Sequence, residues 1–275
     1  MNTKQIGFIG GGNMASSLIG GLVSNGYPAD KLTVVDLDSE KLSYLNQTFG
    51  VNTLQDSKEL ATKADVLVLA IKPQHMQSVT QDLGQAIQDK SPVVVSIAAG
   101  IRVEALDRWL GGHLPIVRCM PNTPALVKTG ATGLYANAQV TENQKDLVES
   151  LLRAVGVTVW VEEEHELDAV TALSGSGPAY FFMIMEALEA AGIKAGLNQK
   201  TAQLLTQETA LGAAKMALES SEPASVLRQR VTSPGGTTER AIGILEEQGL
   251  RDILQAALLG AKERSIELSD ELGNN

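Results

Sequence analysis

A glycine-rich turn close to the N-terminus constrains the fold of this chain more than any other feature. Residues 10–15 read GGGNMA, the pattern G-x-G-x-x-A, between an apolar run, Gln5–Ile9, and a helical pattern, Asn13–Asn25. In such a turn Gly10 permits a tight reversal, Gly12 lets a ligand approach the backbone, and Ala15 keeps the helix close to the strand. The pattern therefore predicts a strand–turn–helix unit whose helix N-terminus binds the diphosphate of a dinucleotide.

Short runs rich in Val and Ile alternate with amphipathic stretches up to about Val161. Continuous apolar runs of this kind are typical of parallel strands buried on both faces. The expected strands are Gln5–Ile9, Leu32–Asp36, Asp65–Ile71, Pro92–Ala98, Pro115–Met120, Thr132–Tyr135 and Val157–Val161. The expected helices between them are Asn13–Asn25, Ser39–Phe49, His75–Gln88, Val103–Leu110 and a last one from about Thr141 to Val155. This alternation predicts an α/β domain of the Rossmann type, with a doubly wound sheet.

The pattern changes at an acidic turn, residues 162–166, which we interpret as a solvated linker rather than a cation site. From Leu167 onward only helices are expected. They cover about Ala179–Ala195, Gln199–Glu219, Pro223–Arg230, Thr237–Gln248 and Arg251–Leu272. We therefore predict a dinucleotide-binding domain over residues 1–163 and an all-α domain over residues 164–275.

Two stretches of the all-α half are apolar nearly all round, residues 180–185 (YFFMIM) and residues 210–214 (ALGAA). A helix that is apolar on every side must be surrounded by other elements. A helical domain of this size has little interior in which to surround two of them. We therefore expect the C-terminal half to be a dimerisation domain, in a homodimer or a higher multiple of dimers. The alternative is that the α/β half of the same chain covers both helices.

Composition excludes several classes of partner. The net charge of −10 opposes binding to nucleic acid or to an anionic membrane through a general basic surface. No apolar run approaches the length that spans a bilayer, and the N-terminus has no signal-peptide pattern. Cys119 is the only cysteine, which favours a reducing, cytoplasmic location and a buried packing thiol. The three histidines are not at metal-ligand spacing, so no metal site is expected.

The ends of the following strands extend the expected cofactor site. Asp36 ends the second strand, where an acid accepts hydrogen bonds from ribose hydroxyls, repels a 2′-phosphate and favours NAD; the alternative is that it only ends the strand. Lys72 either contacts the cofactor or is a surface charge at a strand end. Small residues end the fourth strand and leave room for the nicotinamide ribose. The predicted cofactor-binding residues are Ile9, Gly10, Gly11, Gly12, Asn13, Met14, Asp36, Ala70, Lys72 and Ala98.

A second motif lies in the all-α half. Residues 231–239 read VTSPGGTTE, with two glycines and two threonines at the start of an expected helix. Successive N–H groups at such a start can hold a carboxylate without a basic residue. Threonine hydroxyls both donate and accept hydrogen bonds. An ordinary helix cap is the alternative.

Together these segments resemble the pyrroline-5-carboxylate reductases, which catalyse the last step of proline biosynthesis. The matching segments are residues 7–14, 69–73, 117–124, 172–180 and 233–238. The glycine turn is shared by many dehydrogenases. The last two segments are specific to this family, and the matches span nearly the whole chain.

The resemblance implies hydride transfer from NADPH or NADH to the imine carbon of a cyclic imino acid, giving L-proline. It implies that the backbone of Gly236 and Thr237 binds the substrate carboxylate. The hydroxyl of Thr238 would be the catalytic group at the ring nitrogen, and Ser176 and Ser233 would line the substrate pocket. It further implies an interlocked dimer, in which the Gly-Gly-Thr-Thr loop and the cofactor face of one site come from different subunits.

The chain departs from the family at several positions. Family members often have serines or a basic residue around Asp36, and many prefer NADPH, so the choice between the two cofactors stays open. Ser57 stands where some relatives have an asparagine that contacts the cofactor, and we include it as a cofactor-binding residue. Ser221 stands where some relatives have a glutamate near the substrate, with Glu222 adjacent, and Arg230 replaces an asparagine seen in relatives. No role is assigned to Glu222 or Arg230.

Two other functions are weighed against this one. A β-hydroxyacid dehydrogenase also combines a Rossmann domain with a helical one, but it needs a lysine or comparable acid–base group facing a hydroxyl. Lys194, Lys200 and Lys215 lie in no recognisable motif. A non-catalytic NAD(P)-sensing dimer would bind cofactor tightly without turnover.

Overall fold

The computed structural model describes residues 3–273. The chain divides into two compact units: an α/β unit, which runs to Ser176 and includes the residues from Ala261 onward, and a helical unit, Gly177–Gly260. No helix in the described range is long and apolar enough to cross a membrane.

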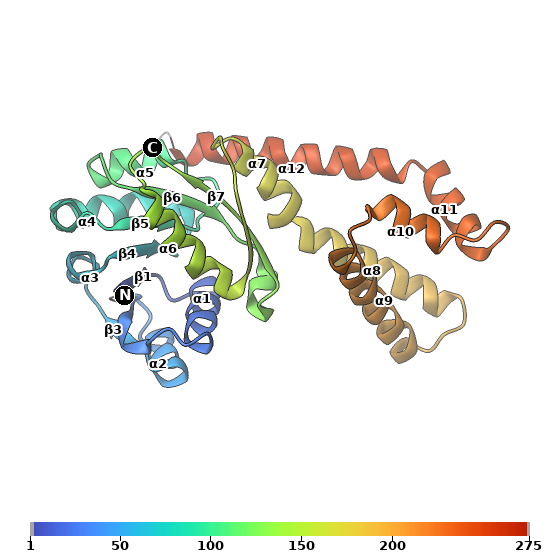
Figure 1. Cartoon of the computed structure of the whole chain (residues 1–275), viewed down its shortest axis with the longest axis horizontal. Coiled ribbons are helices and arrows are strands. Elements are labelled where there is room, and N and C mark those ends of the chain that lie inside the picture. The colour runs from blue at the N-terminus through green and yellow to red at the C-terminus, as the bar shows by residue number, and fades with distance from the viewer. Residues whose placement is uncertain (1–2, 274–275) are drawn as a thin grey trace. The chain divides into compact units, whose positions relative to one another are not determined.

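The α/β unit contains a single eight-stranded sheet with the order β3-β2-β1-β4-β5-β6-β7-β8 (Figure 1). The strands are β1 (Ile6–Ile9), β2 (Leu32–Val35), β3 (Asn52–Leu54), β4 (Val66–Leu69), β5 (Val93–Ser96), β6 (Ile116–Met120), β7 (Gly130–Ala136) and β8 (Gly156–Trp160). All neighbouring pairs are parallel except β6 and β7. Strand order reverses at β1, which lies between β2 and β4, and ligands bind at such a switch point, beyond the carboxyl ends of the strands.

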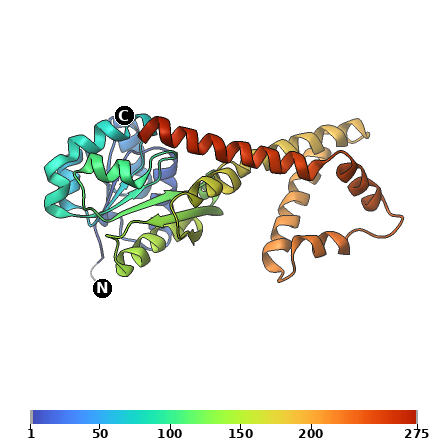
Figure 2. The same ribbon diagram turned by 90° about the horizontal axis from the view of Figure 1, so that it is seen from above.

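Helices cover both faces of the sheet (Figures 1 and 2). One core joins the strands to α1 (Asn13–Ser24), α2 (Ser39–Phe49) and α6 (Glu142–Leu152). The other joins them to α3 (Ser57–Lys63), α4 (Met76–Lys90) and α5 (Val103–Leu110). Neighbouring residues of β1 face opposite cores, Phe8 the first and Ile9 the second. The predicted doubly wound α/β domain is therefore confirmed.

Two short elements, β3 and α3, lie where no element was expected. β3 has three residues at the edge of the sheet and is only partly buried, so it shows no long apolar run. α3 begins after Asp56, whose side chain accepts a hydrogen bond from the N–H of Lys58. The expected bounds of α2 and α5 agree with the structure, and α4 is interrupted at Gly84, which has φ of 40°. Short 3₁₀ turns occupy Ala29–Lys31, Pro73–His75, Thr123–Val127 and Arg153–Val155.

The acidic turn is largely exposed, as expected for a solvated linker, but Glu164 is partly buried and bound to the α/β unit. Glu164 Oε1 accepts hydrogen bonds from the N–H of Val103, at 2.8 Å, and from Nη1 of Arg118, at 2.9 Å. Arg118 is buried in β6, with its side chain 4% exposed. The Glu166 side chain caps the backbone of the same turn by accepting two N–H groups. Glu164 therefore fastens the turn to the α/β unit, whereas the exposed Glu166 carboxylate orders the backbone within the turn.

The chain after this turn packs on the α/β unit. α7 (Glu166–Val170) is followed by a π-helical turn, Thr171–Gly175, and Leu167 is fully buried. The last turns of α12 (Leu250–Gly273) also pack on this unit, as the red helix in Figure 2 shows. Ser265 Oγ donates to Asp168 Oδ1 at 2.7 Å, and Leu272 lies beside Gly100. The boundary between the two compact units therefore lies after Ser176, whereas the expected domain boundary lies after residue 163.

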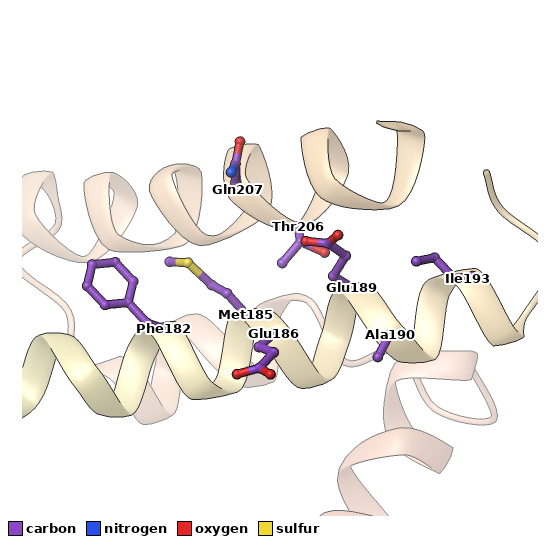
Figure 3. Close-up of a pocket in the computed structure, with 8 residues that line it drawn as sticks. All are labelled: Phe182, Met185, Glu186, Glu189, Ala190, Ile193, Thr206 and Gln207. Atoms are coloured by element: carbon purple, nitrogen blue, oxygen red, sulfur yellow. The ribbon is translucent and has the colours of Figure 1, made fainter. Parts of the chain in front are cut away.

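The helical unit contains α8 (Gly177–Lys194), α9 (Gln199–Glu219), α10 (Ala224–Arg230), α11 (Thr237–Glu247) and the first part of α12. Asn198 caps α9 as expected, by accepting from the N–H of Thr201. Large apolar side chains on α8 and α9 stay exposed, among them Phe181 at 64% and Leu218 at 86%. α8 and α9 also border a groove of about 390 Å³, which Phe182, Met185 and two glutamates line (Figure 3).

Candidate active site

The glycine turn after β1 has a conformation that only glycine adopts easily at its first position. Gly10 has φ of 101°, and its N–H donates to the carbonyl of Val35 at 2.8 Å. A Cβ atom at Gly10 would lie 2.3 Å from the carbonyl oxygen of Ala70 in the neighbouring strand segment. The turn is therefore packed tightly between the ends of β2 and β4.

Gly12 is required for a different reason. It is the N-cap of α1, with φ of −72° and no side chain capping the helix. A Cβ atom there would meet no other part of the described chain within 4 Å. Neither backbone strain nor packing within the chain explains a glycine at this position. A ligand that approaches the free N–H groups of α1 explains it, because a side chain would occupy the ligand's place. The residues present therefore fit a dinucleotide diphosphate.

Asp36 lies directly beside this turn. Its Oδ2 atom accepts a hydrogen bond from the N–H of Gly11 at 2.7 Å, and its Oδ1 atom accepts from the N–H of Asp38 at 2.9 Å. Each carboxylate oxygen has further lone pairs that can accept ribose hydroxyls. The same negative charge opposes a phosphate on that ribose. The geometry thus suits the ribose role expected for Asp36.

The remaining predicted cofactor residues lie along the same edge of the sheet. Ala70 follows β4, and its N–H donates to the carbonyl of Ile9 at 2.8 Å. Lys72 is exposed two residues further on, and Ala98 follows β5. Ser57 begins α3, directly after the parallel strand β3. The carboxyl ends of parallel strands share one edge, so the structure brings the predicted set to one side of the sheet.

Ser176 reaches that edge through the π-helical turn. The N–H of Ser176 donates to the carbonyl of Thr171 at 2.8 Å, which closes the wide turn. A Cβ atom at Gly175 would lie 2.6 Å from Cε of Met120, the last residue of β6. β6 is parallel to β5, so this turn lies next to the end of β5. π-Helical turns occur often at functional sites.

The Gly-Gly-Thr-Thr segment begins α11 in the helical unit. Gly235 has φ of 69°, and the N–H of Gly236 donates to the carbonyl of Ser233 at 3.0 Å. The predicted carboxylate donor at Gly236 is therefore engaged within its own turn. The N–H groups of Thr237 and Thr238 lie in the first turn of α11, where a helix offers no backbone acceptor. The N-cap is Gly236, so no N-cap side chain accepts from them either.

Glu239 is a contributor to this loop that sequence reasoning missed. Its Oε2 atom accepts a hydrogen bond from the N–H of Gly235 at 2.7 Å. A glutamate at the third helical position often accepts a backbone N–H before the helix, and that spacing could have revealed this contact, although a capping box would use the N-cap Gly236 rather than Gly235. Arg230 forms an ion pair with Glu222 at 2.8 Å, so these two residues neutralise each other.

Cys119 is a packing residue, as expected. It is buried in β6, and burial raises the pKa of its thiol, so it offers no nucleophile. Between residues 3 and 273, no group of three or more His, Cys, Asp or Glu side chains is arranged to hold a metal ion.

Comparison with known proteins identifies the family. Residues 164–268 match the family model described as pyrroline-5-carboxylate reductase dimerisation, and residues 5–100 match the model described as NADP oxidoreductase coenzyme F420-dependent. The chain is 49% identical to the pyrroline-5-carboxylate reductase of Pseudomonas aeruginosa over 273 residues, which is 99% of this chain and 100% of the relative. The chain belongs to the pyrroline-5-carboxylate reductase family.

Solved structures of this family agree with the fold. The pyrroline-5-carboxylate reductase of Coxiella burnetii has a TM-score of 0.94 at 48% identity, covering 98% of this chain and 99% of that one. The Plasmodium falciparum enzyme, solved with NADP bound, has a TM-score of 0.86 at 28% identity and similar coverage. The Aquifex aeolicus prephenate dehydrogenase, at 15% identity and a TM-score of 0.54, shares the fold alone.

Proposed function

We propose that this protein reduces the C=N bond of 1-pyrroline-5-carboxylate to give L-proline, with NADPH or NADH as hydride donor. The observation that carries the proposal is the 49% identity over the full length of a pyrroline-5-carboxylate reductase. That length includes both the glycine turn and the Gly-Gly-Thr-Thr helix start. Family membership favours this reaction over a β-hydroxyacid dehydrogenase and over a non-catalytic cofactor sensor.

The α/β unit would hold the cofactor, which supplies the hydride when bound. The first-turn N–H groups of α1 receive the diphosphate, and the open space above Gly12 admits it. Asp36 accepts the adenosine ribose hydroxyls beside the turn. Ala70, Lys72 and Ala98, with Ser57 farther along the same edge, would contact the rest of the cofactor. This assignment rests on their shared sheet edge and on the family pattern.

The helical unit would bind the substrate. The N–H groups of Thr237 and Thr238 receive the substrate carboxylate at the positive end of the α11 dipole. The hydroxyl of Thr238 would hydrogen-bond the ring nitrogen. The family pattern adds Ser233 of this unit and Ser176 of the α/β unit as further substrate-binding residues. Hydride adds to the imine carbon and a proton to the nitrogen, which completes the amine. A protonated imine is already electrophilic, so positioning and electrostatic preorganisation supply most of the catalysis.

We also propose that the enzyme is a homodimer or a multiple of dimers, with each active site shared between subunits. The dimerisation model begins at residue 164, which supports a cofactor domain over residues 1–163 and a dimerisation domain over residues 164–275. The exposed apolar side chains of α8 and α9 supply a surface for the second subunit. A cytoplasmic location is consistent with the lone, reduced Cys119.

Two measurements test this proposal. The first follows oxidation of NADPH and NADH with 1-pyrroline-5-carboxylate and, separately, with 3-hydroxyacids; the expected result is turnover of the imine alone. Turnover of a hydroxyacid, or tight cofactor binding without any turnover, would contradict it. The second measures Thr238→Ala, which should lose kcat by on the order of 100-fold while its affinity for the cofactor stays unchanged. Unchanged kcat would remove Thr238 from the catalytic role.

A further inference from the structure

Asn122 forms a buried link between two parts of the α/β unit. It follows β6 and is 9% exposed. Its Nδ2 atom donates to the carbonyl oxygen of Ser174 at 2.9 Å, and its Oδ1 atom accepts from the N–H of Ala131 in β7 at 2.8 Å. Both ends of the side chain are therefore bound to backbone groups, and this pair of partners fixes the orientation of the amide.

The sequence explains why the carbonyl of Ser174 needs a side-chain partner. In an α-helix this oxygen would accept from the N–H four residues later, but that residue is Pro178, which has no N–H. A partly buried carbonyl without a donor costs free energy. Asn122 supplies the missing donor from a position 52 residues earlier in the chain. The Ser174 side chain is engaged elsewhere, because its Oγ atom donates to the carbonyl of Val170 at 3.0 Å.

The link lies at the edge of the sheet that holds the cofactor residues. Asn122 and Met120 are both at the carboxyl end of β6, beside β5. Met120 packs against Gly175 while Asn122 binds Ser174, so two side chains from one strand end hold the π-helical turn. Ser176 is the next residue, and its N–H closes that turn.

We propose that Asn122 is a positioning residue, which fixes the π-helical turn so that Ser176 keeps its place relative to the cofactor edge. This inference rests on the proposed function, because Ser176 is a substrate-pocket residue only in that reaction. Hydride transfer requires close and aligned reactants, and a displacement of about 1 Å can lower the rate on the order of 100-fold. Loss of the Asn122 link therefore acts on kcat through Ser176.

Asn137 offers a matched control in the same unit. Its Oδ1 atom accepts from the N–H of Ile116 at 3.0 Å, and its Nδ2 atom donates to the carbonyl of Leu114 at 2.9 Å. It thus makes the same two kinds of hydrogen bond, but at the amino-terminal end of β6, away from the cofactor edge. A purely structural role predicts equal effects for the two asparagines.

The experiment compares Asn122→Asp with Asn137→Asp in the full-length enzyme. Aspartate keeps the acceptor and removes the amide donor, so both variants should lower the melting temperature. The Asn122 variant should also lose kcat by about 10- to 100-fold, with its Kd for NADH within about twofold of wild type. The Asn137 variant should keep kcat within about twofold. Unchanged kcat in the Asn122 variant, or equal losses in both, would overturn the proposal.

A second measurement does not depend on turnover. Hydrogen exchange across residues 171–178 should be faster in Asn122→Ser than in wild type and unchanged in Asn137→Ser, because only the first loses the link to the π-helical turn. Serine introduces no buried charge, so Asn122→Ser and Asn137→Ser can also replace the two aspartate variants if Asn122→Asp does not fold. Equal exchange in all three proteins would overturn the inference. If wild type does not reduce the imine, the proposed function fails while the exchange result still decides the role of Asn122.

Discussion

The glycine turn contains two glycines that are needed for different physical reasons, and a pair of variants separates them. Gly10→Ala places a Cβ against the Ala70 carbonyl in a left-handed conformation, so it should lower the free energy of unfolding by about 2 kcal/mol or more. Gly12→Ala enters open space and should leave the stability of the cofactor-free protein within about 0.5 kcal/mol. It should nevertheless weaken NADH binding more than about tenfold, because the methyl group occupies the diphosphate position. Thermal unfolding and fluorescence titration measure both effects.

Asp36 is the residue expected to set the choice between NADH and NADPH. The variant Asp36→Ser removes this negative charge beside the turn. Its ratio of kcat/KM for NADPH to kcat/KM for NADH should rise on the order of tenfold, because no carboxylate then repels the 2′-phosphate. Asp38→Ser is the control, since Asp38 carries the same charge two residues away and caps α2. A ratio that does not change in Asp36→Ser, or that changes equally in both variants, would show that Asp36 does not bind the ribose.

At the scale of elements, the acidic turn is fastened by one buried arginine. Glu164 accepts from Arg118 and from the first N–H of α5, so its loss leaves the guanidinium without its ion-pair partner. We expect Glu164→Ala to lower the free energy of unfolding by about 2 kcal/mol, less than for a fully buried pair because Glu164 is partly exposed. Glu163→Ala, on the exposed neighbouring residue, should change it by less than about 0.5 kcal/mol. Chemical denaturation measures both; equal effects would contradict the role of the pair.

Elements with visible end signals were predictable from the sequence, and elements held by distant contacts were not. α2 has an Asp38 cap and ends at Gly50 in a left-handed conformation, and α9 has its Asn198 cap, so the expected bounds of both agree with the structure. β3 and α3 are too short to show a period. The π-helical turn is bound by Asn122, which is remote in sequence, and no pattern within residues 171–175 predicts the turn.

The same distinction applies to the candidate site. The glycine turn and the Gly-Gly-Thr-Thr helix start are local patterns, so their chemistry could be inferred from residue types and spacing. The sequence does not show which N–H groups of the Gly-Gly-Thr-Thr helix start stay free. That depends on the turn between Ser233 and Gly236 and on the carboxylate of Glu239. The buried pairing of Arg118 with Glu164 joins segments 46 residues apart, so no sequence window contains it.

At the scale of the whole molecule, the two halves of the proposed chemistry lie in different compact units. The proposed cofactor edge belongs to the α/β unit, and the helix start proposed to bind the carboxylate belongs to the helical unit. The helical unit also exposes large apolar side chains on α8 and α9, among them Phe181 and Leu218. Such a surface requires a partner, and a second copy of the chain can supply one. Dimerisation would then complete the active site as well as bury apolar area.

A mixing experiment tests whether each site uses two subunits. One variant, Gly12→Val, lacks cofactor binding, and the other, Thr238→Ala, lacks the catalytic hydroxyl; each alone should have little activity. If sites are shared, a mixed dimer has one site with both defects and one site with neither. Random reassembly of an equal mixture makes half of the dimers mixed, so activity should recover to about a quarter of wild type. If each site lies within one subunit, every site keeps one defect and no activity returns. The recovered rate after joint unfolding and refolding therefore decides between the two arrangements, with each variant refolded alone as its control.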